Sequence, residues 1–103
     1  MTIEKRDEQI IFGFDGCEYE LRSHPYEPCL YICQNGEIVK VLHNAFDAYD
    51  LPEIFAAGET VRSIDGKDIN EASFCRVLIA ALNDRRYEMD WTFAARLAAS
   101  GTR

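Results

Sequence analysis

The chain has 103 residues, of which 48% are hydrophobic and 28% charged, and 18 acidic against 11 basic residues give a net charge of −7. This length and composition predict a single globular domain and exclude general disorder. The acidic excess argues against direct binding to nucleic acids or anionic membranes, because both favour a basic surface.

The first eight residues are mostly charged and lack the apolar core of a signal peptide. No later stretch has the length and apolar character of a membrane span. We therefore expect a cytoplasmic protein with a flexible tail over residues 1–8 and a single α+β domain over residues 9–103. In that compartment the four cysteines should be free thiols.

A first hairpin is predicted from residues 9–14 and 17–23, which flank the two-residue turn Asp15-Gly16. The alternation of side chains gives this hairpin one apolar face and one mostly polar face, as a sheet with a single buried face requires. The predicted cross-strand pairs on the apolar face are Phe14 with Cys17, Phe12 with Tyr19, and Ile10 with Leu21.

A second hairpin is predicted from residues 29–34 and 37–43, which flank the turn Asn35-Gly36. Its second face is less polar than a solvent-exposed face should be. Either a helix covers this face, or it is exposed and used, for example in a homodimer. The predicted pairs on the first face are Ile32 with Val39 and Leu30 with Val41, following from Gln34 opposite Glu37.

Residues 45–57 look helical, with Asn44 as a favourable N-cap residue. Pro52 predicts a break near Leu51, and Asp50 would then cap a second short helical turn. Further along, the Asp65-Gly66 turn separates two short apolar runs that form either a minor hairpin or an irregular link.

The clearest helix begins near Asp68 or Asn70 and ends near residues 83–84, and a last helix over about 90–100 ends at Gly101. Strands followed by helices favour the α+β class. We predict an antiparallel sheet of about four strands, with two to three helices packed on one face. The apolar stripe of the clearest helix consists of Phe74, Val77, Leu78, Ala81 and Leu82.

The cysteine and histidine side chains offer an alternative function. Cys17, His24, Cys29 and Cys33 fall within 17 residues and are ligand types that suit zinc. However, Cys29 and Cys33 would lie roughly 13 Å apart along one strand, and small buried thiols also act as hydrophobic residues. A cysteine paired with His24 or His43 could form a nucleophilic dyad, but no signature of an enzyme family surrounds either pair. We therefore expect no cofactor, no metal and no catalytic activity.

Acidic residues dominate the segment between Lys40 and Arg62, which contains no basic residue. Like charges on one helix face repel, so an uncompensated acidic stripe is a candidate for docking on a basic protein; the alternative is a merely solvated face. Tyr26, Tyr31 and Tyr49 either belong to such an interface or cover the sheet. The predicted partner-binding residues are Glu18, Glu20, Asp47, Asp50 and Glu53.

The stretch over residues 58–69 reads GETVRSIDGKDI and precedes the clearest helix. It resembles the G-D-x-I-x-x-I-N-G strand and turn that precede the peptide-binding helix of PDZ domains, which implies a peptide- or protein-binding module using a sheet edge and the helix at 70–83. In size and acidity the chain is similar to small accessory proteins of phages and mobile elements, including anti-CRISPR inhibitors. We predict a non-enzymatic inhibitor or adaptor that docks on a basic, nucleic-acid-binding protein.

Overall fold

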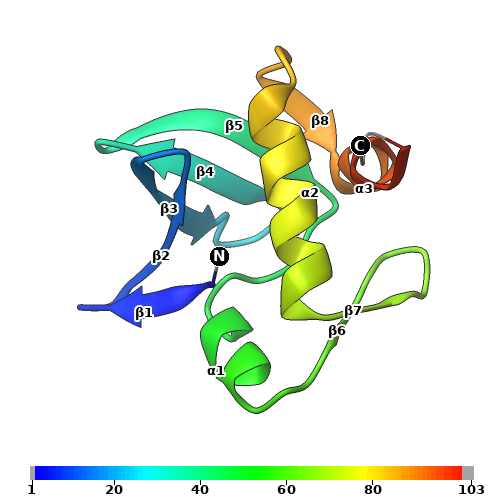
Figure 1. Ribbon diagram of the computed structural model, residues 1–103, viewed down its shortest axis with the longest axis horizontal. Coiled ribbons are helices and arrows are strands. Elements are labelled where there is room, and N and C mark those ends of the chain that lie inside the picture. The colour runs from blue at the N-terminus through cyan, green and yellow to red at the C-terminus, as the bar shows by residue number, and fades with distance from the viewer. Residues whose placement is uncertain (1, 101–103) are drawn as a thin grey trace.

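The computed structural model describes residues 2–100, which form a six-stranded sheet with helices on one side (Figure 1). The α+β class is confirmed, and the sheet has six strands where about four were predicted. The main sheet runs in the order β1 (Glu4–Arg6), β2 (Gln9–Phe14), β3 (Cys17–Ser23), β4 (Leu30–Gln34), β5 (Glu37–His43) and β8 (Glu88–Asp90). A separate antiparallel pair consists of β6 (Val61–Arg62) and β7 (Asp68–Ile69). The helices are α1 (Leu51–Ala56), α2 (Glu71–Asn83) and α3 (Trp91–Ser100).

Strand β1 lies where a flexible tail was expected. Residues 4–6 pair with β2, and Ile3 is buried while its backbone N–H donates to a Glu71 carboxylate oxygen at 2.9 Å. The connecting turn uses Asp7 and Glu8, both with positive φ. A turn without glycine and a strand of three charged residues give no hairpin signal, so the sequence does not predict this pairing.

The sequence does not predict strand β8 either, because three residues are too few to show the alternation of side chains that is typical of a strand. It runs parallel to β5, with Leu42 opposite Met89, and α2 forms the crossover. The buried Lys40 helps to hold this connection: its ammonium donates to the backbone carbonyls of Asp84, at 2.9 Å, and of Arg86. Burial lowers the pKa of Lys40.

The register of the first hairpin is confirmed at all three predicted pairs: Phe14 with Cys17, Phe12 with Tyr19 and Ile10 with Leu21. Both turn residues, Asp15 and Gly16, have positive φ, as a type I′ turn requires. Cys17, however, is exposed rather than buried. It lies beside the turn, at the end of the hairpin.

The second hairpin begins as predicted, with Gln34 opposite Glu37, but a β-bulge shifts the register between Ile32 and Cys33. The extra residue places Ile32 opposite Lys40 and Leu30 opposite Leu42. The predicted pairs with Val39 and Val41 are therefore wrong. The extra residue is Val39 of β5, and it interrupts the strict alternation on which the prediction relied.

The helix predicted over residues 45–57 is reduced to the six residues of α1. Asn44 does not cap a helix; it has a φ of 57° and its side chain donates to an Asp90 carboxylate oxygen at 2.6 Å. Asp50 occupies the N-cap position without a capping side-chain bond, and Pro52 fits the first turn, where its missing N–H costs nothing. The break predicted near Leu51 is where the helix begins.

Helices α2 and α3 begin at well-defined caps. Asn70 accepts a bond from the Ser73 N–H, and Asp90 accepts one from the Thr92 N–H, each at 2.9 Å. Four of the five predicted stripe residues of α2 are buried and Leu82 is partly buried. The expected stop at Gly101 lies outside the described residues. Within residues 2–100, none of the helices has the length and apolar character that crossing a membrane would require.

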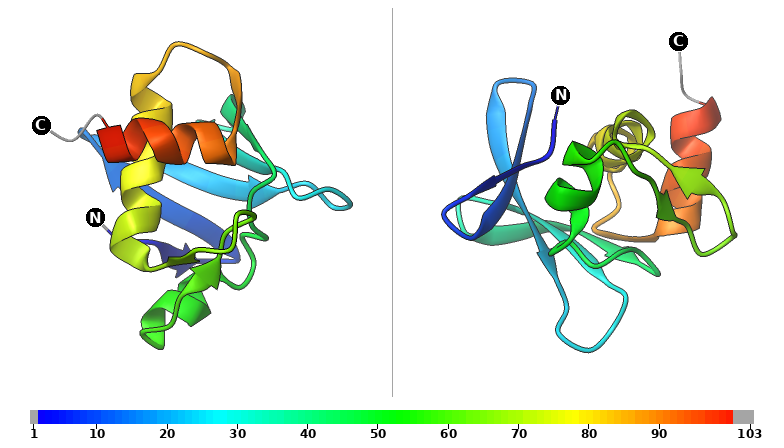
Figure 2. Two further views of the ribbon diagram at one scale, coloured as in Figure 1. Left: turned by 90° about the vertical axis from the view of Figure 1, so that its right-hand side faces the viewer. Right: turned by 90° about the horizontal axis from the view of Figure 1, so that it is seen from below.

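The core lies between one face of the sheet and the helices (Figure 2). We call this the inner face of the sheet and the opposite one the outer face. Four aromatic residues from the 45–50 segment and the three helices pack closely, with ring centroids 5.0–5.8 Å apart. These rings are Phe46, Phe55, Phe74 and Trp91. No helix of the described chain lies against the outer face. Leu42, which the sequence placed on the second face of hairpin two, instead packs in the core on the inner face.

Candidate functional site

Three of the five predicted partner-binding residues lie in ion pairs with basic residues of the same chain. Two of these bases belong to β1, the strand that the sequence did not reveal. The sequence indicated an acidic stripe without compensating bases, but the structure pairs these three carboxylates with bases. Ion pairs near the surface contribute little stability. The pairs are Arg6–Glu18 at 2.9 Å, Arg22–Glu20 at 3.0 Å and Lys5–Glu53 at 3.6 Å.

Asp47 and Asp50 have different roles. One oxygen of Asp47 accepts a bond from the Tyr49 N–H at 2.9 Å and lies 3.5 Å from the Ser23 hydroxyl, so this side chain shapes the irregular segment before α1. The Ser23 hydroxyl also accepts the Ala48 N–H at 2.5 Å. Asp50 is exposed, and its carboxylate has no ion pair within residues 2–100. Of the two, Asp50 is therefore the one free to meet a partner.

A hollow of about 250 Å³ is lined both by the irregular segment before α1 and by the first hairpin. Glu8 and Glu20 contribute its acidic groups, and its one base, Arg22, is paired with Glu20. Tyr49 is 69% exposed and contributes an aromatic ring. We call this the acidic hollow; its lining residues are Glu8, Ile10, Glu20, Leu21, Arg22, Ser23, Ala48 and Tyr49.

The charge of the chain is unevenly distributed, with 14 of the 18 acidic residues but only six of the 11 basic residues before residue 71. Four of these six bases are in ion pairs, and Lys40 is buried against carbonyls. Within the described chain, Lys67 is left as the one exposed base of this part without an ion pair. The strand-rich part therefore keeps an acidic surplus, which a count of charges by segment would have revealed from the sequence.

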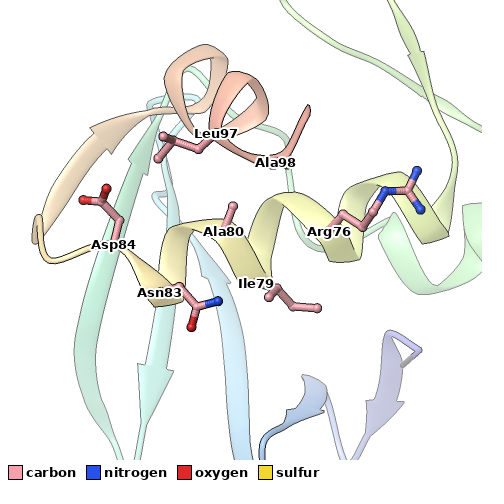
Figure 3. A pocket seen from close by; sticks show the side chains of 7 residues that line it. All are labelled: Arg76, Ile79, Ala80, Asn83, Asp84, Leu97 and Ala98. Carbon is pink, nitrogen blue, oxygen red and sulfur yellow. The ribbon is translucent and has the colours of Figure 1, made fainter. Parts of the chain in front are cut away.

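A second recess, of about 350 Å³, lies between α2 and α3 (Figure 3). Ile79, Ala80, Leu97 and Ala98 give it apolar walls, with Arg76, Asn83 and Asp84 also lining it. The PDZ resemblance implied a binding site between a sheet edge and this helix. The strand–turn–helix order is present, but β6 and β7 pair with each other outside the main sheet, and the recess lies between two helices.

The cysteines and histidines predicted as an alternative site do not gather. Within residues 2–100, no three or more His, Cys, Asp or Glu side chains are grouped so as to hold a metal ion. The Nδ1 atom of His24 accepts the N–H groups of Tyr26 and Glu27, at 3.1 and 3.2 Å, and so stabilises the connector. Instead of His24, His43 lies beside Cys29, with 3.9 Å between Sγ and Nδ1.

The other thiols have separate environments. Cys17 is exposed, whereas Cys33 and Cys75 are buried, and burial raises the pKa of Cys75 to about 11. Burial likewise raises the pKa of Cys33. Thiols in such surroundings are poor nucleophiles and behave as small hydrophobic residues.

Comparison of the chain with known protein families, with curated proteins and with solved structures finds no match.

Proposed function

We propose that this protein is a non-enzymatic inhibitor or adaptor that docks through the acidic hollow on a basic surface of another protein. The observation that supports this proposal is the acidic surplus left on the strand-rich part, residues 2–70, where every base except Lys67 is paired or buried. A basic surface of the kind that binds nucleic acid is the complementary partner, as the likeness to anti-CRISPR inhibitors also implies. The proposal includes a cytoplasmic location, which suits four cysteines that form no disulfide.

The hollow supplies the parts that such an interface uses. Glu8, which lines the hollow, and Asp50, which follows the lining residue Tyr49 in the chain, are exposed carboxylates without an ion pair within residues 2–100; they attract a basic partner and speed its encounter. Tyr49 offers a large, exposed aromatic surface next to them, of the type that often carries binding energy at the centre of an interface. Among the predicted residues, Asp50 thus remains the direct candidate. Glu18, Glu20 and Glu53 would contribute only after exchanging Arg6, Arg22 and Lys5 for bases of the partner.

The test is capture of partners from nuclease-treated bacterial lysate by the tagged protein, by a hollow variant and by a matched control. The hollow variant carries Glu8→Lys in the lining and Asp50→Lys next to the lining residue Tyr49. The control carries Glu37→Lys and Glu59→Lys, which change the net charge equally at exposed positions outside the hollow. We expect a basic nucleic-acid-binding protein to be retained by the wild type and the control and lost from the hollow variant.

The alternatives give different results. Equal loss from both variants would mean that net charge, and not this hollow, governs the association. Equal retention by both would contradict acidic docking. A homodimer formed through the outer face of the sheet would appear as a doubled mass in sedimentation of the purified protein.

A further inference from the structure

A cysteine that directly precedes β4, a histidine of β5 and a glutamate of β8 lie next to one another on the outer face of the sheet. Cys29 directly precedes β4, and the register of β4 with β5 places it opposite His43. The distance from Cys29 Sγ to His43 Nδ1 is 3.9 Å, and His43 Nε2 lies 2.7 Å from a carboxylate oxygen of Glu88 in β8. Each ring nitrogen of His43 thus has one of the other two side chains as its neighbour.

This group of side chains borders a hollow of about 190 Å³ lined by Glu27, Pro28, Cys29, His43 and Asn44. Cys29 is only 4% exposed, so a reagent would reach it through this hollow. The imidazole and the carboxylate are far more accessible, with side chains 45% and 61% exposed. The site therefore combines a sheltered thiol with a base that can exchange protons with solvent.

We propose that Cys29 is a nucleophilic thiol that accepts an acyl group from small uncharged activated esters, with His43 as its general base and Glu88 as the residue that positions His43. This site goes beyond the proposed docking function and uses none of the residues of the acidic hollow.

The hydrogen bonds determine the direction of proton transfer. When Nε2–H of His43 donates to Glu88, the other nitrogen, Nδ1, carries a lone pair directed at the thiol. As sulfur attacks the ester carbonyl, the thiol proton moves to Nδ1 and a sulfur–carbon bond forms. The carbon–oxygen bond to the leaving alcohol then breaks, and the leaving oxygen takes the proton from Nδ1. The products are an S-acyl cysteine and the free alcohol.

The surroundings of Cys29 select the electrophile. Burial, followed by the nearby Glu27 and Glu88, raises the pKa of the Cys29 thiol, and the hydrogen bond with Tyr31 only partly opposes this. The thiol is therefore neutral before the reaction and depends on the base for activation. Because the same carboxylates repel anions, a neutral acyl donor is favoured over a negatively charged one.

The experiment treats the intact protein with p-nitrophenyl acetate and follows acetylation of each cysteine by peptide mass spectrometry. Cys75 is the internal control for burial, because it is also 4% exposed. We expect Cys29 to be acetylated faster than Cys75 in the wild type. His43→Ala should slow acetylation of Cys29 by about a hundredfold, the scale of general-base catalysis, and leave that of the exposed Cys17 unchanged.

Added imidazole should restore the Cys29 rate in His43→Ala, which a purely structural role of His43 would not produce. Glu88→Gln should slow the wild-type reaction by a smaller factor and have no further effect in the His43→Ala background. Equal rates at Cys29 and Cys75 in the wild type would overturn the proposal. An unchanged rate of Cys29 acetylation in His43→Ala would also overturn it. The unfolding temperature of each variant is measured alongside as a control for folding.

Discussion

The two faces of the main sheet differ in what they carry. On the inner face, Leu30, Ile32 and Leu42 have no exposed surface and pack against the helices. The outer face carries apolar residues such as Cys33 and Val41. It also carries the Arg22–Glu20 ion pair and the contacts that run from Cys29 through His43 to Glu88. This difference indicates that the inner face determines the stability of the fold, whereas side chains of the outer face and the sheet edge are available for function.

The largest effect that this difference predicts is on stability, at the centre of the inner packing. Phe74 is fully buried and its ring contacts those of Phe46, Phe55 and Trp91. Phe74→Ala should lower the free energy of unfolding by about 3–5 kcal/mol, because it removes apolar contacts and leaves a cavity. Urea unfolding followed by circular dichroism measures this. Tyr49→Ala, at an exposed position, is the control and should change stability by no more than about 0.5 kcal/mol.

A smaller effect is expected where the sheet passes into α3. Asp90 accepts the Thr92 N–H at the start of the helix and the side-chain amide of Asn44. Asp90→Ala should therefore cost about 1–2 kcal/mol at neutral pH. Asp90→Asn, which keeps one side-chain acceptor, should cost less.

The same residue predicts a pH dependence. The hydrogen bond from Asn44 is the main cause of a lowered pKa for Asp90. A carboxyl group with a lowered folded pKa stabilises the protein above its unfolded pKa of about 3.9 and loses this contribution as the pH falls through the folded value. The stability difference between wild type and Asp90→Ala should thus be full at pH 7 and shrink below about pH 4. A difference that grows on acidification would contradict this assignment.

The smallest effect on stability is expected for the exposed ion pairs. Arg6→Ala removes the partner of Glu18, and both side chains are more than half exposed. The free energy of unfolding should hardly change, because solvent screens exposed charges. The released carboxylate adds to the acidic surplus, so binding to a basic partner should become slightly tighter. A large loss of stability would mean that this ion pair stabilises the fold. It would contradict the inference that stability is determined by the inner face.

The sequence predicts local features well where a turn and an alternation agree. The Asp15-Gly16 turn fixes the register of the first hairpin, and the apolar stripe of α2 identifies its buried side. The short strands β1 and β8 could not be predicted, because three residues form a strand only when a neighbouring strand provides hydrogen bonds. Because the sequence does not predict β1, it also does not place Arg6 beside Glu18 or Lys5 beside Glu53.

The candidate sites depend even more on pairing. The predicted register of the second hairpin would place Cys29 opposite Leu42, whereas the bulge brings His43 to that position. One residue inserted in the pairing thus creates the thiol–imidazole contact. In the same way, the sequence identifies Glu20 and Asp50 as acidic candidates, but only the folded chain places Glu8 and Tyr49 in one hollow with Glu20.

The salt dependence of binding tests the docking proposal most directly. The dissociation constant of the captured partner would be measured from low to physiological and higher salt for the wild type and for the Glu8→Lys, Asp50→Lys variant. We predict that wild-type binding weakens steadily as salt rises, since exposed charges are screened beyond about 10 Å at 0.1 M salt. The variant should bind more weakly at low salt and respond less to added salt. Wild-type affinity that does not change with salt would contradict docking through the acidic hollow.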